Sequence, residues 1–273
     1  MFHVLRGVLL ACLLAQPLLA QGKGLSICFR EDAPPFSFLD DAGKPSGYTV
    51  DLCTGVAARM GHADPAMVPV TSETRFEVLG AQGCDMLCGA TTVTIKRRET
   101  MDFSLITFVT DTALLFPTEI LKSRPDGDRP LSVGYLENTT TKDNINTGRV
   151  LTGDPASFKF EPISTHQDAA DAILAGKLDA YVADREILNQ IFEQKPDLSK
   201  THMISRRGLS YEPYAIAIAR DRPGADDLRR DLDRHLADMF RDGTALSLVE
   251  THVPNRLKDE VLEALFEIQS LPE

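Results

Sequence analysis

Short apolar segments alternate with helical ones along the chain, and this alternation constrains the fold more than any other feature of the sequence. Between residues 25 and 90, two segments with helical periodicity separate three strand-like runs. The runs are Leu25–Arg30, Met67–Val70 and Asp85–Ala90, and the helices begin near Val50 and at Thr74. A β-α-β-α-β order predicts a parallel sheet with helices on both faces, because each parallel connection crosses over the sheet.

A second unit of the same kind begins at residue 131. Leu131–Leu136 and Leu178–Ala183 are apolar runs typical of strands, and Ala169–Ala175 between them has the pattern of a helix. Asp184 stands at the end of the later strand. Ligands of open α/β sheets bind beyond the carboxyl ends of the strands, so this end is a candidate site.

The third region returns to the first unit. Tyr214–Ala219 is a strongly apolar strand, and the helix Ala225–Arg241 follows it. A chain of 273 residues can form two moderate domains. We expect two α/β lobes joined by two hinge strands, with lobe 1 formed by residues 21–114 and 214–273 and lobe 2 by residues 115–213. A cleft between such lobes closes by rotation at the hinge.

Residues 1–20 have the pattern of a signal peptide. Arg6 precedes an apolar run, Val8–Leu14, and Ala20 is a small residue of the kind found at a cleavage site. The run is shorter than the roughly 20 residues of a transmembrane helix. We therefore expect secretion to the periplasm.

The charge balance limits the possible partners. The chain has 40 acidic and 29 basic residues, a net charge of -11. This balance argues against nucleic acid, whose phosphates attract basic surfaces. It also opposes an anionic ligand at long range, so a site for an anion needs a local cluster of arginines.

The cysteines favour disulfides over a metal site. Cys28, Cys53, Cys84 and Cys88 follow the signal peptide, without the CxxC pairs typical of zinc sites. If Cys84 and Cys88 lie on one strand, their Cα atoms are roughly 13 Å apart, too far for a bridge. They would then pair with Cys28 and Cys53, in either combination. Buried free thiols are the alternative.

Three segments together resemble a known family. They are REDAPPFSFLDDAGKPSGYTVDL, CDMLCGATTVTIKRRETMDFS and GKLDAYVAD, and the most specific motif is T-x-T-x-x-R at Thr92, Thr94 and Arg97. They resemble the family 3 periplasmic solute-binding proteins of amino-acid ABC transporters. The resemblance covers most of the mature chain and implies a type II periplasmic binding protein fold, with an amino acid clamped between the lobes and delivered to a membrane permease. We expect a monomer that uses no cofactor and catalyses no reaction.

The resemblance also implies roles for the clamp. The arginine aligned with Arg97 holds the α-carboxylate, helped by Thr92 and by the Thr139–Thr140 loop, and the aspartate aligned with Asp184 holds the α-ammonium. A bidentate cation and an anion suit these two groups. Without the resemblance, Arg97 would be read as part of a solvated charge run and Asp184 as a helix N-cap.

Within the family, the pattern is most similar to glutamate/aspartate-binding proteins. In that subfamily the residues aligned with Arg30, Ser72, Arg75 and His166 surround the second carboxylate of the ligand. Two further cations suit such a group, because an unpaired buried charge is costly. The pattern therefore favours glutamate or aspartate.

Simpler interpretations of these residues exist, and the match is imperfect. Arg75 could form a salt bridge with Glu73 or Glu77, and His166 could be a surface or helix-start residue. Three positions depart from the family: Ala90 replaces a common Ser, Asn138 a Gly and Ala215 a Gly.

Two other functions stay open. One is an enzyme resembling cyclohexadienyl dehydratases, with Glu31, Asp32 or His166 as general acid or base. The other is an orphan sensory protein that hands its ligand to a receptor.

Overall fold

The computed structural model describes residues 24–121, 129–146, 158–256 and 259–271. The predicted signal peptide lies outside these ranges. Within them, no helix is both long and apolar enough to cross a membrane.

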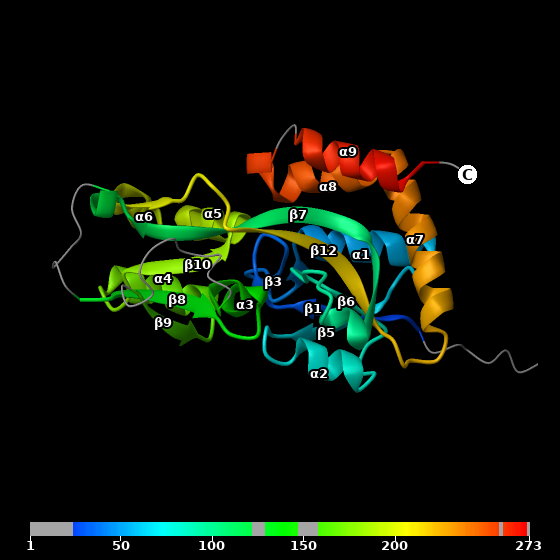
Figure 1. Ribbon diagram of the computed structural model, residues 1–273. Coiled ribbons are helices and arrows are strands. Elements are labelled where there is room, and N and C mark those ends of the chain that lie inside the picture. The colour runs from blue at the N-terminus through cyan, green and yellow to red at the C-terminus, as the bar shows by residue number, and fades with distance from the viewer. Residues whose placement is uncertain (1–23, 122–128, 147–157, 257–258, 272–273) are drawn as a thin grey trace, which may run out of the picture.

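One mixed sheet runs through both lobes of the molecule (Figure 1). Its strand order is β5-β1-β6-β12-β7-β10-β8-β9, and β11 pairs with part of β7. At each end of the sheet the strands are parallel, as the sequence predicts. The outer strands are β1 (Ser26–Arg30), β5 (Ala66–Val70) and β6 (Met86–Cys88) in the first lobe, and β8 (Leu131–Leu136), β9 (Phe158–Ile163), β10 (Ala180–Asp184) and β11 (His202–Ile204) in the second.

Two long antiparallel strands, β7 (Met101–Pro117) and β12 (Ser210–Ala219), connect the lobes (Figure 1). β12 pairs with β6 of the first lobe, and β7 pairs with β10 and β11 of the second. The apolar run of the sequence predicts part of β12, whereas β7 is not predicted, because threonines and Asp111 interrupt its apolar pattern. The lobe boundaries predicted after residues 114 and 213 fall inside these strands and stay a prediction.

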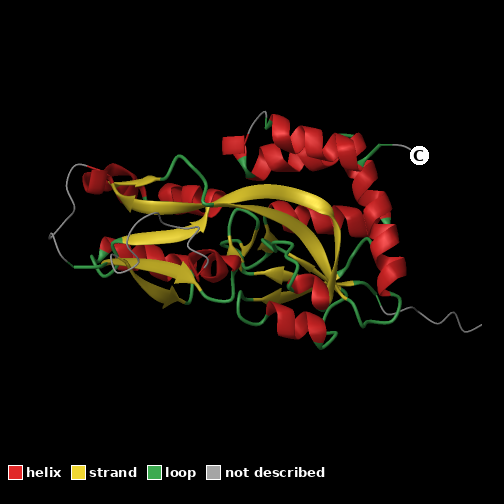
Figure 2. Cartoon of the chain, in the orientation of Figure 1, coloured by secondary structure: helices red, strands yellow, loops and turns green. Residues whose placement is uncertain are grey.

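Helices cover both faces of the sheet in the first lobe (Figure 2). On one face, α1 packs against α7 and α8, and α9 packs against α7 and β7; α2 packs on the other face against β1 and β6. Adjacent residues of β1 serve these two faces, since Ile27 and Cys28 belong to different apolar clusters. The helices are α1 (Tyr48–Arg59), α2 (Arg75–Gly80), α7 (Ala225–Arg241), α8 (Thr244–His252) and α9 (Glu260–Gln269), with the 3-10 turns η1 (Arg97–Glu99) and η4 (Pro254–Arg256).

The second lobe has shorter helices. They are α3 (Thr140–Asn146), α4 (His166–Leu174), α5 (Arg185–Gln194) and α6 (Pro196–Thr201), with the 3-10 turn η2 (Thr118–Leu121). A small separate sheet of β2 (Asp32–Ala33), β3 (Ser37–Leu39) and β4 (Pro45–Ser46) follows β1 and leads the chain into α1. Gly47 begins that helix with φ +112°, and a Cβ there would lie 2.6 Å from the Phe36 carbonyl oxygen, so glycine is required.

Two disulfides cross-link the first lobe, as the cysteine count predicts. Cys28 of β1 pairs with Cys84, and Cys53 of α1 pairs with Cys88 of β6; the Cα separations are 5.6 and 6.4 Å. Cys84 and Cys88 are not bonded to each other, in agreement with the strand-length argument. The structure thus selects one of the two combinations left open by the sequence.

Candidate functional site

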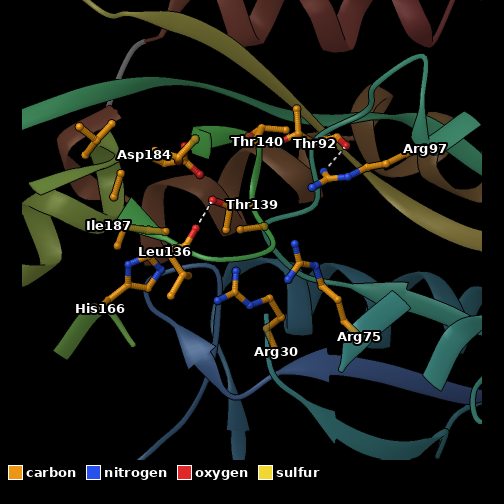
Figure 3. Close-up of a pocket in the computed structure, with 14 residues that line it drawn as sticks. Arg30, Arg75, Thr92, Arg97, Leu136, Thr139, Thr140, His166, Asp184 and Ile187 are labelled. Carbon is orange, nitrogen blue, oxygen red and sulfur yellow. Dashed lines mark hydrogen bonds between the residues drawn. The ribbon is translucent and has the colours of Figure 1, made fainter. Parts of the chain in front are cut away.

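A cleft between the lobes brings together all but one of the predicted site residues (Figure 3). From the first lobe it is lined by Arg30, Arg75, Ala90, Thr92 and Arg97, and from the second by Leu136, Thr139, Thr140, Thr141, His166, Val182, Ala183, Asp184 and Ile187. The space left free between them is about 20 Å³, little more than one water molecule needs. An amino acid therefore enters only when these residues move apart.

Arg30 stands at the carboxyl end of β1 and is 2% exposed. Its Nη2 atom lies 2.8 Å from Asp32 Oδ1, and its Nε donates to the same oxygen at 2.9 Å. The stem of the side chain packs on Gly89, where an added Cβ would lie 3.2 Å from Arg30 Cγ. Arg30 is thus fixed at the cleft and shares its charge with one carboxylate.

Arg75 is the first residue of α2 and is 1% exposed. Its Nη1 donates to the Ser72 carbonyl and its Nη2 donates to the Asn138 carbonyl at 2.6 Å, which links the two lobes. Within the described ranges, it forms no salt bridge with Glu73 or Glu77, so that simpler interpretation is wrong. Ser72 is buried but does not line the cleft; its carbonyl instead supports Arg75.

Asn138 explains one departure from the family pattern. Its φ of +58° lies in the left-handed region that favours glycine, and asparagine is one of the few other residues that adopt it readily. The replacement therefore keeps the turn, and it leaves the carbonyl available to Arg75.

Arg97 leaves the charge run and turns into the cleft (Figure 3). Its Nη1 donates to the Thr92 carbonyl at 2.7 Å, while Lys96, Arg98 and Glu99 are exposed. The Phe76 ring lies beneath both Arg75 and Arg97, with 4.3 and 4.8 Å between ring centroid and guanidinium carbon. These cation–π contacts hold two like charges near one another. Phe76 was not among the predicted site residues.

The arginine side of the cleft carries an excess of positive charge. Burial lowers the pKa of Arg75, and repulsion from Arg30 and Arg97 lowers it further. Burial also lowers the pKa of Arg97, against the attraction of Glu212, Asp143 and Asp184. Arg75 Nε is buried without a hydrogen bond in the described part of the chain, whereas Arg30 Nη2 is ion-paired with Asp32 at 2.8 Å. This environment favours an anion.

Asp184 provides the opposite charge from the second lobe. It occupies the N-cap position of α5, but its side chain makes no capping hydrogen bond and instead accepts one from the Tyr214 hydroxyl. Burial raises the pKa of Asp184 to about 7, and repulsion from Glu212 adds to the rise. A cation at this carboxylate would stabilise its ionised form.

His166 begins α4 and is 7% exposed, so it is a helix-start residue but not a surface one. Its Nδ1 lies 2.8 Å from the Tyr181 hydroxyl. Burial, and then repulsion from Arg30, lowers the pKa of His166 to about 3. The imidazole is therefore neutral near pH 7. Its buried Nε2 has no hydrogen-bond partner among the described residues.

The hydroxyl residues of the second lobe are held by fixed partners. Thr139 Oγ1 donates to the Leu136 carbonyl at 2.7 Å, and Thr140 Oγ1 donates to Glu212 Oε2 at 2.8 Å. Glu212 and Tyr214 were not among the predicted site residues, although an acidic residue beside an apolar strand is a signal that could have identified Glu212.

Two of the three residues considered for an enzyme, Asp32 and His166, are placed poorly for proton transfer. Asp32 is paired with Arg30, and His166 is a neutral imidazole with a strongly lowered pKa. A general base needs a pKa near the working pH.

Comparisons with known proteins show which proteins this chain is similar to. Residues 25–255 match the family described as bacterial extracellular solute-binding proteins, family 3. The glutamine-binding protein of Geobacillus stearothermophilus is 27% identical over 184 residues, which are 66% of this chain and 66% of that protein, just under two thirds. The glutamate/aspartate import solute-binding protein of Escherichia coli (strain K12) is 22% identical over 263 residues, 92% of this chain and 83% of that protein.

Solved structures share the two-lobed fold. An ancestral arginine-binding protein bound to arginine has a TM-score of 0.72 at 23% identity, over 85% of this chain and 99% of that one. The GluR0 ligand binding core in complex with L-glutamate has a TM-score of 0.69 at 20% identity, with the same coverage. The ancestral amino acid-binding protein AncCDT-1, described as a precursor of cyclohexadienyl dehydratase, has a TM-score of 0.68 at 21% identity, over 84% of this chain and 94% of that one.

Proposed function

The chain belongs to the bacterial extracellular solute-binding proteins of family 3, and we propose that its solute is an amino acid with two carboxylates, glutamate or aspartate. The protein would bind it in the interlobe cleft in the periplasm and deliver it to the permease of an ABC transporter. Relatives with names that specify glutamine, glutamate/aspartate and cystine support an amino acid as the solute.

One observation carries the choice of an acidic amino acid. Three arginines of the first lobe line one cleft, and two of them, Arg30 and Arg75, are almost completely buried. Asp32 pairs with Arg30 alone. The remaining positive charge is costly in a buried site, so a ligand that brings two carboxylates offsets it better than a ligand that brings one.

Each charged group of the ligand would bind to different residues of the cleft. The α-carboxylate would take the fork of Arg97, and the α-ammonium would pair with Asp184. The second carboxylate would lie against Arg30 and Arg75. Neutral His166 would donate one hydrogen bond to it from Nε2, in the tautomer in which Nδ1 accepts from Tyr181.

Glutamine is the nearest competitor, since the Geobacillus relative is named for it. Its amide oxygen can accept from one arginine, but its amide nitrogen presents two more donors to a site that already holds donors. The charge on the second arginine would then stay unpaired. We therefore expect glutamate to bind more tightly than glutamine.

Isothermal titration calorimetry on the mature protein, with each of the twenty amino acids and with cystine, tests the proposal. Glutamate or aspartate should bind most tightly. In a separate unfolding experiment, the ligand at a concentration of about 100 times its Kd should add roughly 2.7 kcal/mol to the free energy of unfolding. Tighter binding of glutamine, arginine or cystine would contradict the acidic-ligand assignment. Uptake of labelled glutamate by cells, with and without the cognate permease, would separate transport from delivery to a receptor.

A further inference from the structure

Glu212 is a buried carboxylate for which the clamp described above has no role. It lies on β12 and is 2% exposed. It accepts hydrogen bonds from Ser210 Oγ at 2.7 Å, Thr140 Oγ1 at 2.8 Å and Asn144 Nδ2 at 2.9 Å. Within the described ranges no cation forms an ion pair with it. Neutral donors therefore compensate this charge, which is costly to bury.

Two of the hydrogen-bond donors to Glu212, Thr140 and Asn144, belong to helix α3. Thr140 and Asn144 are four residues apart on α3, so they share one face of the helix. Their hydrogen bonds attach the start of α3 to β12, one of the two strands that join the lobes. Thr139 and Thr140 line the cleft. Glu212 thus fixes the position of this threonine pair relative to the hinge.

Glu212 and Asp184 are connected through β7, because Thr112 pairs with Asp184 and donates from its Oγ1 to Glu212 Oε1 at 3.3 Å, and the charge of Glu212 acts on both ends of the clamp. It attracts Arg97 and raises the pKa of that guanidinium against the effect of burial. It repels Asp184 and, after burial, is the strongest influence that raises the pKa of that carboxyl.

Other groups face Asp184 as well. Tyr214 on β12 donates a hydrogen bond that lowers the pKa of Asp184, and Arg30 on β1 attracts it, while Glu186 on α5 repels it. Glu186 has partners of its own, since it accepts from Thr110 and lies 3.4 Å from Arg256. Glu212 differs from Glu186 in its direct contact with a residue that lines the cleft.

We propose that Glu212 is a positioning residue of the solute site, which holds Thr140 against the hinge strand and places a negative charge beside Arg97 and Asp184. This inference rests on the proposed function, because it assumes that an amino acid binds between Arg97 and Asp184. In this role Glu212 sets the position of Thr140 in the cleft. It also sets the pH above which Asp184 is ionised and can bind an ammonium group.

Glu212→Gln tests both parts of the role with L-glutamate as the probe. The amide oxygen of glutamine can still accept from Asn144 and Ser210, but its nitrogen then takes the place of Oε2 and no longer accepts from Thr140, so Thr140 is held less firmly and affinity at pH 8 should fall roughly tenfold. Loss of the like charge favours ionised Asp184. Affinity for L-glutamate falls on acidification, when Asp184 is protonated. In the variant this fall, the acid limb of the profile, should therefore occur at lower pH.

Glu161→Gln is the matched control. It removes the same charge from β9, where Glu161 accepts from Ser132 and Lys159 outside the cleft. Both readouts should stay at their wild-type values in this variant. A Glu212→Gln protein with the affinity and pH profile of Glu161→Gln would overturn the proposal.

A second variant covers the case in which Glu212→Gln does not fold. Ser210→Ala removes one donor and keeps the carboxylate, so it should weaken affinity about threefold and leave the acid limb in place. Unchanged affinity would overturn the positioning role. If wild type and Glu161→Gln both fail to bind any amino acid, the proposed function itself is refuted.

Discussion

Arg75 shows how the charge of a single residue selects a solute. Its guanidinium lies over the Phe76 ring, and repulsion from Arg30 and Arg97 adds to the burial that lowers its pKa. A carboxylate that approaches Arg75 relieves this repulsion, whereas an amide does not. Specificity for an acidic ligand should therefore depend on Arg75 more than affinity for amino acids in general does.

We expect Arg75→Met to weaken glutamate binding by about 2 to 4 kcal/mol and glutamine binding by much less, because the lost charge faces only the acidic ligand. The lost hydrogen bonds to Ser72 and Asn138 affect the binding of both ligands. The difference between the two losses in binding free energy therefore measures the effect of the charge of Arg75. Calorimetry with both ligands measures it. Arg98→Met, at an exposed residue over Phe103 outside the cleft, is the control. Equal losses for the two ligands would contradict the acidic pocket.

At the scale of elements, β6 carries the chain from the core of the first lobe into the site. It is cross-linked to α1 through Cys88, and Ala90 and Thr92, which line the cleft, follow it. The sequence placed this strand nearly correctly, since its apolar run depends on local spacing, but it left the pairing of the cysteines open. It gave no warning of β7, whose pattern is set by partners far along the chain.

Cys53→Ala combined with Cys88→Ala should lower the free energy of unfolding by about 2 to 4 kcal/mol, because the bridge restricts the unfolded chain. Denaturant titration monitored by circular dichroism measures the change. We expect the glutamate Kd to stay within about threefold at temperatures where the variant is folded. An unfolding midpoint equal to that of wild type would argue against this bridge, and reduced wild type is the control.

At the scale of the whole molecule, the cleft belongs to neither lobe alone. Arg75 of the first lobe donates to Asn138 of the second, and the free space of about 20 Å³ is too small for an amino acid. The two hinge strands, β7 and β12, are the connections about which the lobes can separate. The described arrangement is thus a closed one.

Small-angle X-ray scattering should detect this closure. The ligand-free protein should have a larger radius of gyration than the protein saturated with glutamate, because an amino acid enters only an open cleft. Arg97→Ala protein should show no such decrease at the same glutamate concentration, since it lacks the clamp for the α-carboxylate. An identical radius for free and saturated wild type would contradict closure by the lobes.

The sequence by itself determined the alternating elements, the two lobes, the even set of cysteines and, through its family motifs, nine of the fourteen described residues that line the cleft. These depend on local periodicity, or on motifs in which neighbouring positions keep their spacing. Only the tertiary structure decided which cysteines pair, that Ser72 stays outside the cleft and that Asp184 faces Tyr214 without capping α5. It also revealed Phe76 and Glu212, because their roles depend on partners that the fold brings together from distant segments.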